Sequence, residues 1–144
     1  MKRMDDSPNH KALSDFRYQL RKFLAVSADA AKEVGIDPTQ HQLLLVIKGS
    51  ELESANIGEI ADRLLIRHHS AFEMVNCCEH NDWVRREKDE HDSRQMQVRL
   101  TQKGEGILAK LSAVHTRELQ TSRPDLIQTL TTIHRNQSET TGAE

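Results

Sequence analysis

The sequence has few aromatic residues, few glycines and prolines, and only two cysteines among its 144 residues. The cysteines are neighbours, Cys77 and Cys78, and Cα atoms about 3.8 Å apart are too close for a relaxed disulfide. A disulfide framework is therefore excluded, and we expect a reducing, cytoplasmic compartment. The sequence contains no run of eighteen apolar residues, which excludes a membrane-spanning helix. No apolar segment follows the charged N-terminus, which argues against a secretory signal.

The sequence also has no excess of positive charge. Lys and Arg total 20 against 22 Asp and Glu, giving a net charge of -2. A protein that coats DNA without specificity would be strongly basic. Because this chain is not, any anionic partner would have to bind a local patch of positive charge. The length suits one domain, but with 36% hydrophobic and 3% aromatic residues a monomer would have a thin core. We therefore expect association with a second copy.

The first part of the sequence predicts a loose arm followed by two helices. Polar residues 1–12 form the expected arm, and an apolar stripe at helical spacing covers 14–34. Gly35 is the residue type preferred just after the end of a helix. Asp37 is a favourable cap for a second helix over 38–48.

Two short helices and a hairpin follow. Residues 56–64 and 68–80 each carry one apolar face, and the tight connection 65–67 joins them, a pattern typical of a helix-turn-helix. The period then changes from 3.6 to 2 over 83–88 and 94–100, which predicts a β-hairpin, or wing, directly behind the second short helix.

The C-terminal part predicts one long helix and one short helix. The long helix begins after Thr101, and we expect Arg123-Pro124 to break it. A short helix over 126–135 and a frayed end over 136–144 complete the chain. The predicted class is therefore mainly α with a small β-wing, in the order α-α-α-α-β-β-α-α.

The helix-turn-helix with its wing predicts DNA reading. A major groove about 12 Å wide admits one helix, whose N-terminal side chains reach base edges. The outward residues of this candidate reading helix are His68, His69, Ser70, Glu73, Asn76 and Cys77. Asn can pair with adenine, and Glu can accept a hydrogen bond from cytosine. Residues 56–103 hold eight cations and nine anions, and the acidic Glu73 keeps open an alternative, a winged-helix protein-interaction module.

A motif in the second strand sharpens the interpretation. Asp92-Ser93-Arg94-Gln95-Met96-Gln97-Val98-Arg99-Leu100-Thr101, followed by Lys103-Gly104, fits the pattern D-x-R-x-x-x-V-x-L-T-x-x-G. Behind a helix-turn-helix and Trp83-Val84-Arg85-Arg86, this motif resembles the MarR family of bacterial transcriptional regulators. The resemblance covers about Leu13 to Arg135. The sequence departs from the family at Cys78, where Leu is usual, and at Asp82, where Gly commonly ends the reading helix.

The resemblance implies a single MarR-type domain over 1–144 that forms an intertwined helical homodimer. Helices 13–34 and 102–135 would hold the two copies together, and 56–100 would form the DNA-reading lobe. Each copy would present its reading helix to one of two successive major grooves of a pseudo-palindromic operator, about 34–36 Å apart. Such a protein is a sequence-specific transcriptional regulator and a repressor that a ligand releases.

The resemblance also assigns roles to particular residues. Arg94 enters the minor groove, where a narrow A·T-rich groove attracts arginine, and Asp92 pairs with Arg94 to hold the hairpin tip. Arg85 and Arg86 are phosphate candidates. A small-molecule effector, often phenolic or anionic in the family, would contact Phe16, Arg17, Leu20 and His41.

Other chemistry has weaker support. Protonation of His68 and His69 would add positive charge beside phosphate, so we expect operator affinity to rise as the pH falls from about 8 to 6. A zinc site at His69, Glu73, Cys77 and His80 would need the face used for DNA, and a straight helix rarely surrounds one ion. A redox switch at Cys77 has no visible cationic neighbour. No Cys-His pair with an orienting carboxylate predicts an enzyme, and we expect no cofactor and no metal.

Overall fold

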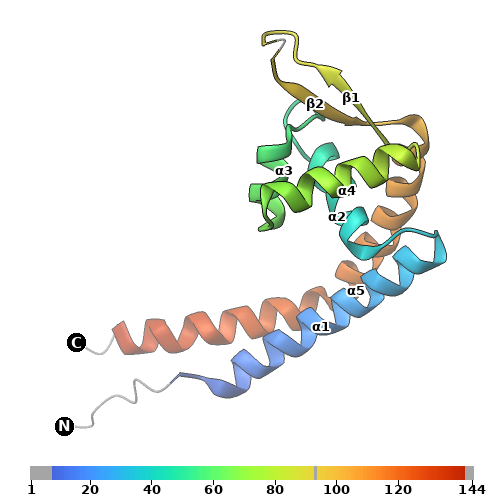
Figure 1. Ribbon diagram of the computed structural model, residues 1–144. Coiled ribbons are helices and arrows are strands. Elements are labelled where there is room, and N and C mark those ends of the chain that lie inside the picture. The colour runs from blue at the N-terminus through green and yellow to red at the C-terminus, as the bar shows by residue number, and fades with distance from the viewer. Residues whose placement is uncertain (1–7, 93, 142–144) are drawn as a thin grey trace. The chain divides into compact units, whose positions relative to one another are not determined.

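The computed structural model describes residues 8–92 and 94–141. The fold is mainly helical with a small two-stranded antiparallel sheet, as the sequence predicts (Figure 1). The elements in order are α1 (His10–Glu33), α2 (Pro38–Lys48), α3 (Ile57–Leu64), α4 (His68–His80), β1 (Val84–Lys88), β2 (Met96–Leu100) and α5 (Gln102–Thr141). None of the helices described is both long and apolar enough to cross a membrane.

The chain divides into two compact units. The helical unit comprises residues 1–27 and 115–144, and the reading unit comprises residues 28–114. The long helices α1 and α5 each contribute to both units. The reading unit contains the whole helix-turn-helix and the wing, so its packing decides how the candidate site is held.

The core of the reading unit draws on every one of its elements. Leu43, Leu44 and Ile47 of α2 are completely buried, and they pack with apolar side chains from α3, α4, both strands and the start of α5. Each such side chain stabilises the fold by about 1.5–3 kcal/mol relative to its exposed state.

Lys48, at the end of α2, donates to Glu53 and to Glu105, both at 3.0 Å. These hydrogen bonds, first that to Glu53, raise the pKa of Lys48.

Three helices end in the same way, on a residue with left-handed backbone. Gly35, Leu65 and Asp82 follow α1, α3 and α4 with φ of 78°, 57° and 61°. At each, two backbone N–H groups return to the last turn, for example Ile66 to Ala61 at 3.0 Å. This is the Schellman motif, in which the left-handed position favours glycine. Asp82 therefore adopts the conformation that a glycine would take there.

The wing pairs β1 with β2 in antiparallel register, with Val84 opposite Leu100 and Arg86 opposite Val98. Ala55, in the loop before α3, forms a bridge with Val98 through hydrogen bonds of 2.8 and 3.1 Å. This bridge could not be predicted from the sequence, because a single paired residue has no periodicity. It ties the middle of β2 to the loop before α3.

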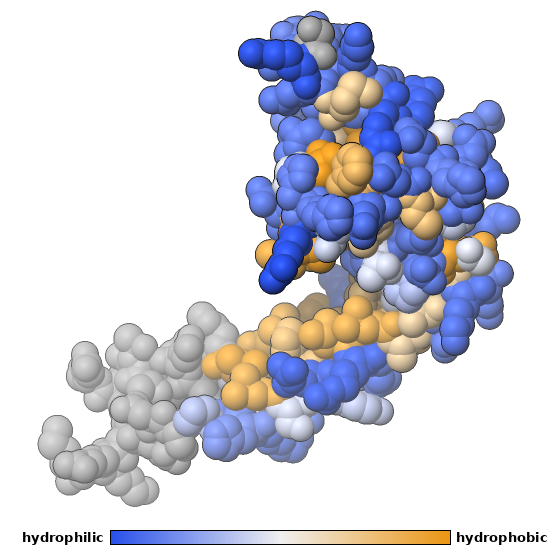
Figure 2. All heavy atoms as spheres, viewed as in Figure 1, coloured by the Kyte–Doolittle hydropathy of each residue, from blue (hydrophilic) through white to orange (hydrophobic). Residues whose placement is uncertain are grey.

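The helical unit pairs the start of α1 with the C-terminal part of α5. Gln19 donates to Thr129 at 3.0 Å, and His115 lies 2.6 Å from the Ser27 hydroxyl with its ring edge against Phe23. Apolar side chains nevertheless gather uncovered along this unit (Figure 2). The apolar face comprises Leu13, Leu20, Leu24, Leu119, Ile127 and Leu130, which are each 43–52% exposed.

Three details of the predicted helices are wrong. The helix α5 continues through Pro124, so the expected break and the separate helix over 126–135 are absent, and helix replaces the frayed end as far as Thr141. A proline removes one hydrogen bond, but the turns on either side keep theirs. The arm expected over 1–12 is also partly helix, because α1 starts at His10, behind a cap in which Asn9 accepts the Ala12 N–H at 3.0 Å; residues 1–7 of the arm lie outside the described residues.

Candidate nucleic-acid interface

The N-terminus of α4 is the one helix start described that has no capping side chain. Asn9, Asn56 and Thr101 each accept a backbone N–H at the start of α1, α3 and α5, and α2 begins with a capping box. The N-cap of α4 is Arg67, whose side chain makes no cap hydrogen bond, and the first turn contains no acidic residue. The free N–H groups and the helix dipole therefore suit a phosphate oxygen.

The outward face of α4 begins with three exposed residues, His68, His69 and Ser70. His69 Nε2 lies 3.1 Å from Glu73 Oε1, one turn further along, and both side chains are largely exposed. Protonation of His69 would therefore place a positive charge beside the Glu73 carboxylate. Both side chains of this pair, like those of His68 and Ser70, are exposed on the predicted reading face.

Asn76 and Arg86, two predicted DNA contacts, are hydrogen-bonded to each other. Arg86 of β1 donates to Asn76 Oδ1 at 2.6 Å and to Glu79 Oε1 at 2.7 Å. Its guanidinium also lies over the Phe72 ring, 5.4 Å from the centroid. The Asn76 oxygen is thus engaged on the side of α4 next to the wing.

The two cysteines differ in environment. Cys77 is exposed, and its Sγ accepts from Gln40 of α2 at 3.2 Å and from Asn81 at 3.8 Å. Cys78 is fully buried in the core, as expected for a small apolar side chain. Burial, with a smaller contribution from Cys77, raises the pKa of Cys78 to about 12. Cys78 therefore stays a neutral thiol that fills space.

The wing tip holds the predicted pair of Asp92 and Arg94. Asp92 Oδ1 accepts from the Arg94 backbone at 3.1 Å and from its Nε at 3.3 Å, and the Arg94 side chain is 91% exposed. The predicted pairing is confirmed; Ser93 of the motif lies outside the described residues. Asp89 accepts from the His91 N–H at 2.8 Å, which lowers the pKa of its carboxyl. Arg85, on the opposite face of β1 from Arg86, is 61% exposed beside Glu87.

Comparison with known proteins relates this arrangement to one family. The sequence model described as "MarR family" matches residues 34–95, from the end of α1 to the wing tip. The HTH-type transcriptional regulator YkoM of Bacillus subtilis is 29% identical over 110 residues, covering 73% of this chain and 69% of YkoM. Both matches, together with the fold, support a winged helix-turn-helix transcriptional regulator of the MarR type.

Two solved structures share the fold of this chain. A mutant MarR from E. coli complexed with operator DNA matches with a TM-score of 0.64 at 18% identity, over 83% of this chain and 87% of that one. A mutant MepR from S. aureus bound to an oligodeoxyribonucleotide matches with a TM-score of 0.64 at 16% identity, over 86% and 94%. At these identities the likeness establishes the fold.

The predicted effector residues of this chain lie in different units. Phe16 is half-buried, and Arg17 and Leu20 are exposed, all on α1 in the helical unit. His41 is buried in α2, within the reading unit. Among the residues described, no three His, Cys, Asp or Glu side chains come together as metal ligands, so the alternative zinc site on α4 is not assembled.

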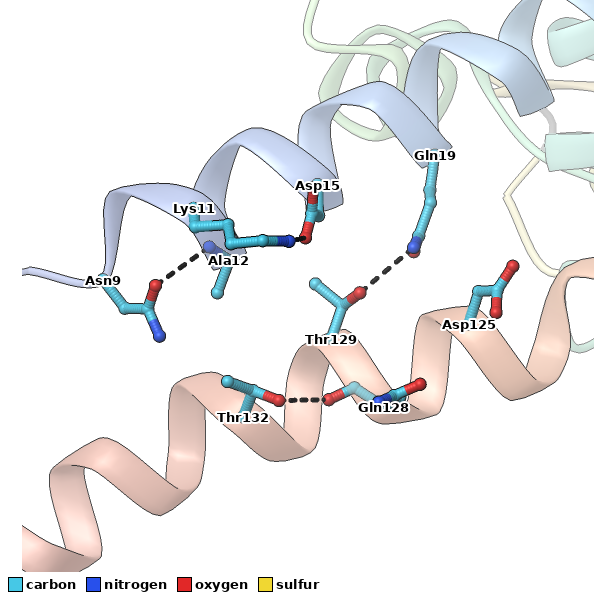
Figure 3. Close-up of a pocket in the computed structure, with 9 residues that line it drawn as sticks. All are labelled: Asn9, Lys11, Ala12, Asp15, Gln19, Asp125, Gln128, Thr129 and Thr132. Atoms are coloured by element: carbon cyan, nitrogen blue, oxygen red, sulfur yellow. Dashed lines mark hydrogen bonds and ion pairs between the residues drawn. The ribbon is translucent and has the colours of Figure 1, made fainter.

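A polar cavity of about 430 Å³ lies in the helical unit, between the start of α1 and the second half of α5 (Figure 3). Lys11 and Asp15 form an ion pair at 2.9 Å on one side, and the Gln19–Thr129 hydrogen bond closes one end. Its lining residues are Asn9, Lys11, Ala12, Asp15, Gln19, Asp125, Gln128, Thr129 and Thr132. None of them is a predicted effector residue.

Proposed function

We propose that this chain is a DNA-binding repressor of the MarR type that binds a pseudo-palindromic operator as a homodimer. The observation that carries the proposal is the uncapped, outward N-terminus of α4 next to a wing tipped by an exposed arginine. The relatives bound to operator DNA and to an oligodeoxyribonucleotide support it. Binding would block access of polymerase to the promoter, and we expect the protein to act in the cytoplasm.

DNA recognition would divide between positioning and reading contacts. The free N–H groups at the start of α4 would bind a phosphate, which fixes the helix in the major groove. His68, His69, Ser70 and Glu73 would then face base edges. Arg94, held by Asp92, would enter the adjacent minor groove.

The proposed homodimer would use the apolar face of the helical unit. Six large apolar side chains 43–52% exposed on one pair of helices form the kind of patch that marks an interaction site. Two copies related by a two-fold axis would bury this face and present two reading helices to one duplex.

Release would follow if a small molecule binds the DNA-incompetent arrangement more tightly than the DNA-bound one. We propose Phe16, Arg17, Leu20 and His41 as contacts of that effector. Alanine substitution at exposed Arg17 should then weaken the response to the effector and leave operator affinity without effector unchanged.

Selection of bound duplexes from random DNA tests the function. We expect a consensus with two-fold symmetry and half-sites one helical turn apart. A gel shift on that consensus should weaken steeply as salt rises, because phosphate contacts release counterions. Enrichment of no sequence, with no shift at low salt, would overturn the proposal.

The acidic residues of α4 favour a second candidate function, a protein-interaction module. Glu73 and Glu79 lie on α4, and the segment 56–103 has a net charge of -1. Such a module would bind no duplex at any salt concentration, so the same gel shift separates the two functions.

Sedimentation equilibrium tests the proposed homodimer. Leu130→Glu places a charge on the apolar face and should shift the chain to monomer. Leu52→Glu is the matched control, because Leu52 is 72% exposed on a loop of the reading unit. Equal association states for both variants would contradict the dimer face.

A further inference from the structure

The side chain of Arg86 differs from that of its neighbour Arg85 in where it points. Side chains alternate along a strand, so Arg86 shares a face with the buried Val84, while Arg85 takes the other face. The Arg86 side chain is only 19% exposed, against 61% for Arg85. Two adjacent arginines on β1 therefore meet different surroundings.

Arg86 contacts three residues of α4 that lie on one helix face. Phe72, Asn76 and Glu79 are spaced at i, i+4 and i+7, which aligns them along the helix. The guanidinium donates to the Asn76 oxygen and to the Glu79 carboxylate, at 2.6 and 2.7 Å, and covers the Phe72 ring. Charge-assisted hydrogen bonds are stronger than neutral ones, and a planar guanidinium suits both the fork and the ring.

If Arg86 bound a phosphate, its guanidinium would have to give up its contacts with Phe72, Asn76 and Glu79. The same contacts occupy the Asn76 oxygen that would otherwise pair with adenine. A two-stranded hairpin is marginally stable by itself, so the wing depends on what holds it to the helices. On β2 the Ala55 bridge does this, and on β1 the Arg86 fork reaches α4.

We propose that Arg86 is a positioning residue, which ties β1 to α4 through Phe72, Asn76 and Glu79 and so sets the wing-tip arginine relative to the reading face. This inference rests on the proposed DNA-binding function. In the DNA complex Arg86 keeps its contacts to α4, and Arg94 and the first turn of α4 bind the duplex together.

Amide hydrogen exchange tests the tie without DNA. Arg86→Gln should speed exchange in the strands Val84–Lys88 and Met96–Leu100 severalfold, because the wing opens more often from α4. Arg85→Gln is the matched control on the same strand and should leave these rates unchanged. Equal strand rates in the two variants would overturn the tie.

Salt-dependent operator binding then separates positioning from phosphate contact. We expect Arg86→Gln to lower operator affinity about tenfold, with less loss on non-specific DNA and an unchanged salt slope. Loss of a phosphate contact would instead lower the slope by about 0.9 and weaken all sequences alike. That second pattern for Arg86→Gln would overturn the proposal.

A double-mutant cycle provides the decisive readout. Arg94→Ala should cost less affinity in the Arg86→Gln background than in the wild type, because a loosened wing no longer places Arg94. Additive costs would overturn the proposal. Arg86→Lys keeps the charge, loses the fork, and should resemble Arg86→Gln, whereas wild-type behaviour would contradict the geometry.

The outcomes also separate this inference from the proposed function. Unfolding midpoints and non-specific affinities of each variant show that it is folded. A wild-type chain that binds no duplex would overturn the DNA-binding function and, with it, the role of Arg86 in operator recognition, while the exchange rates still decide whether Arg86 ties the wing to α4.

Discussion

At the residue scale, backbone conformation at helix ends decides which residues the fold tolerates. Gly35 has no side chain to strain, but Leu65 and Asp82 hold the same left-handed conformation with a Cβ. Leu65 is also 91% exposed, so its side chain gains little from packing. The sequence indicates the first of these ends, because glycine marks it, but leucine at the second carries no such mark.

Replacement of Leu65 by glycine should therefore stabilise the reading unit. The left-handed conformation costs an L-residue about 1–2 kcal/mol, and glycine loses about 0.5–1 kcal/mol of extra chain entropy. We expect Leu65→Gly to raise the free energy of unfolding by about 0.5–1 kcal/mol in urea titrations. Leu65→Ala keeps the Cβ and should show no such gain, and Gly35→Ala should destabilise.

Gly104 of the strand motif is required for close packing. A Cβ there would lie 2.0 Å from the Trp83 carbonyl oxygen, whereas a Cβ at Gly106 would meet nothing within 4 Å. We expect Gly104→Ala to lower the free energy of unfolding by about 3 kcal/mol or more. Gly106→Ala should raise it by about 0.5–1 kcal/mol. Equal effects in thermal unfolding would contradict this packing.

At the element scale, the period of the apolar residues and the capping residues were enough to predict most helices and both strands. The helix-turn-helix and the wing follow from changes of period, and α2 and α3 begin where Asp37 and Asn56 allow. Side-chain partners across elements have no such signature. The contact between Arg86 and α4 depends on where β1 crosses the helix, which only the fold determines, so the sequence does not predict the hydrogen bond between Asn76 and Arg86.

The continuous α5 shows the limit of a local rule. Proline in a helix interior removes one hydrogen bond and disturbs the turn before it, so the predicted break at Pro124 was reasonable. Packing against α1 outweighs that local cost, with Thr129 buried and Gln19 bound to it. Tertiary contacts thus keep the helix whole.

Removal of Pro124 should stabilise α5. We expect Pro124→Ala to restore one backbone hydrogen bond and to raise the free energy of unfolding by about 1–3 kcal/mol. Helical ellipticity should stay close to that of the wild type, because the helix is already continuous. A large gain in ellipticity would instead indicate that the proline breaks the helix.

At the scale of the whole molecule, charge is nearly balanced, so affinity for DNA depends on small local changes. The chain has eight histidines and a net charge of -2 with these neutral. His68 and His69 lie at the start of α4, where a phosphate is expected. Each proton bound there adds a positive charge, and at His69 it also offsets the Glu73 carboxylate.

Operator affinity should therefore rise as the pH falls from about 8 to 6 at constant salt, by roughly tenfold. Histidine in general gains its charge in this range, and the sign follows because phosphate is anionic. Fluorescence anisotropy of labelled operator would measure it. The double variant His68→Gln and His69→Gln should flatten the profile, while His10→Gln, at the exposed start of α1, should not.

The single tryptophan gives the molecule an internal optical probe. Trp83 is 7% exposed and lies at the junction of α4, the wing and α5, next to Gly104. Its emission will follow the opening of the reading unit, whereas far-ultraviolet circular dichroism will be dominated by the long helices that run through both units. Superimposable melting curves from the two signals would mean that the chain unfolds in one cooperative step, and separated curves would mean that the DNA-reading part melts independently.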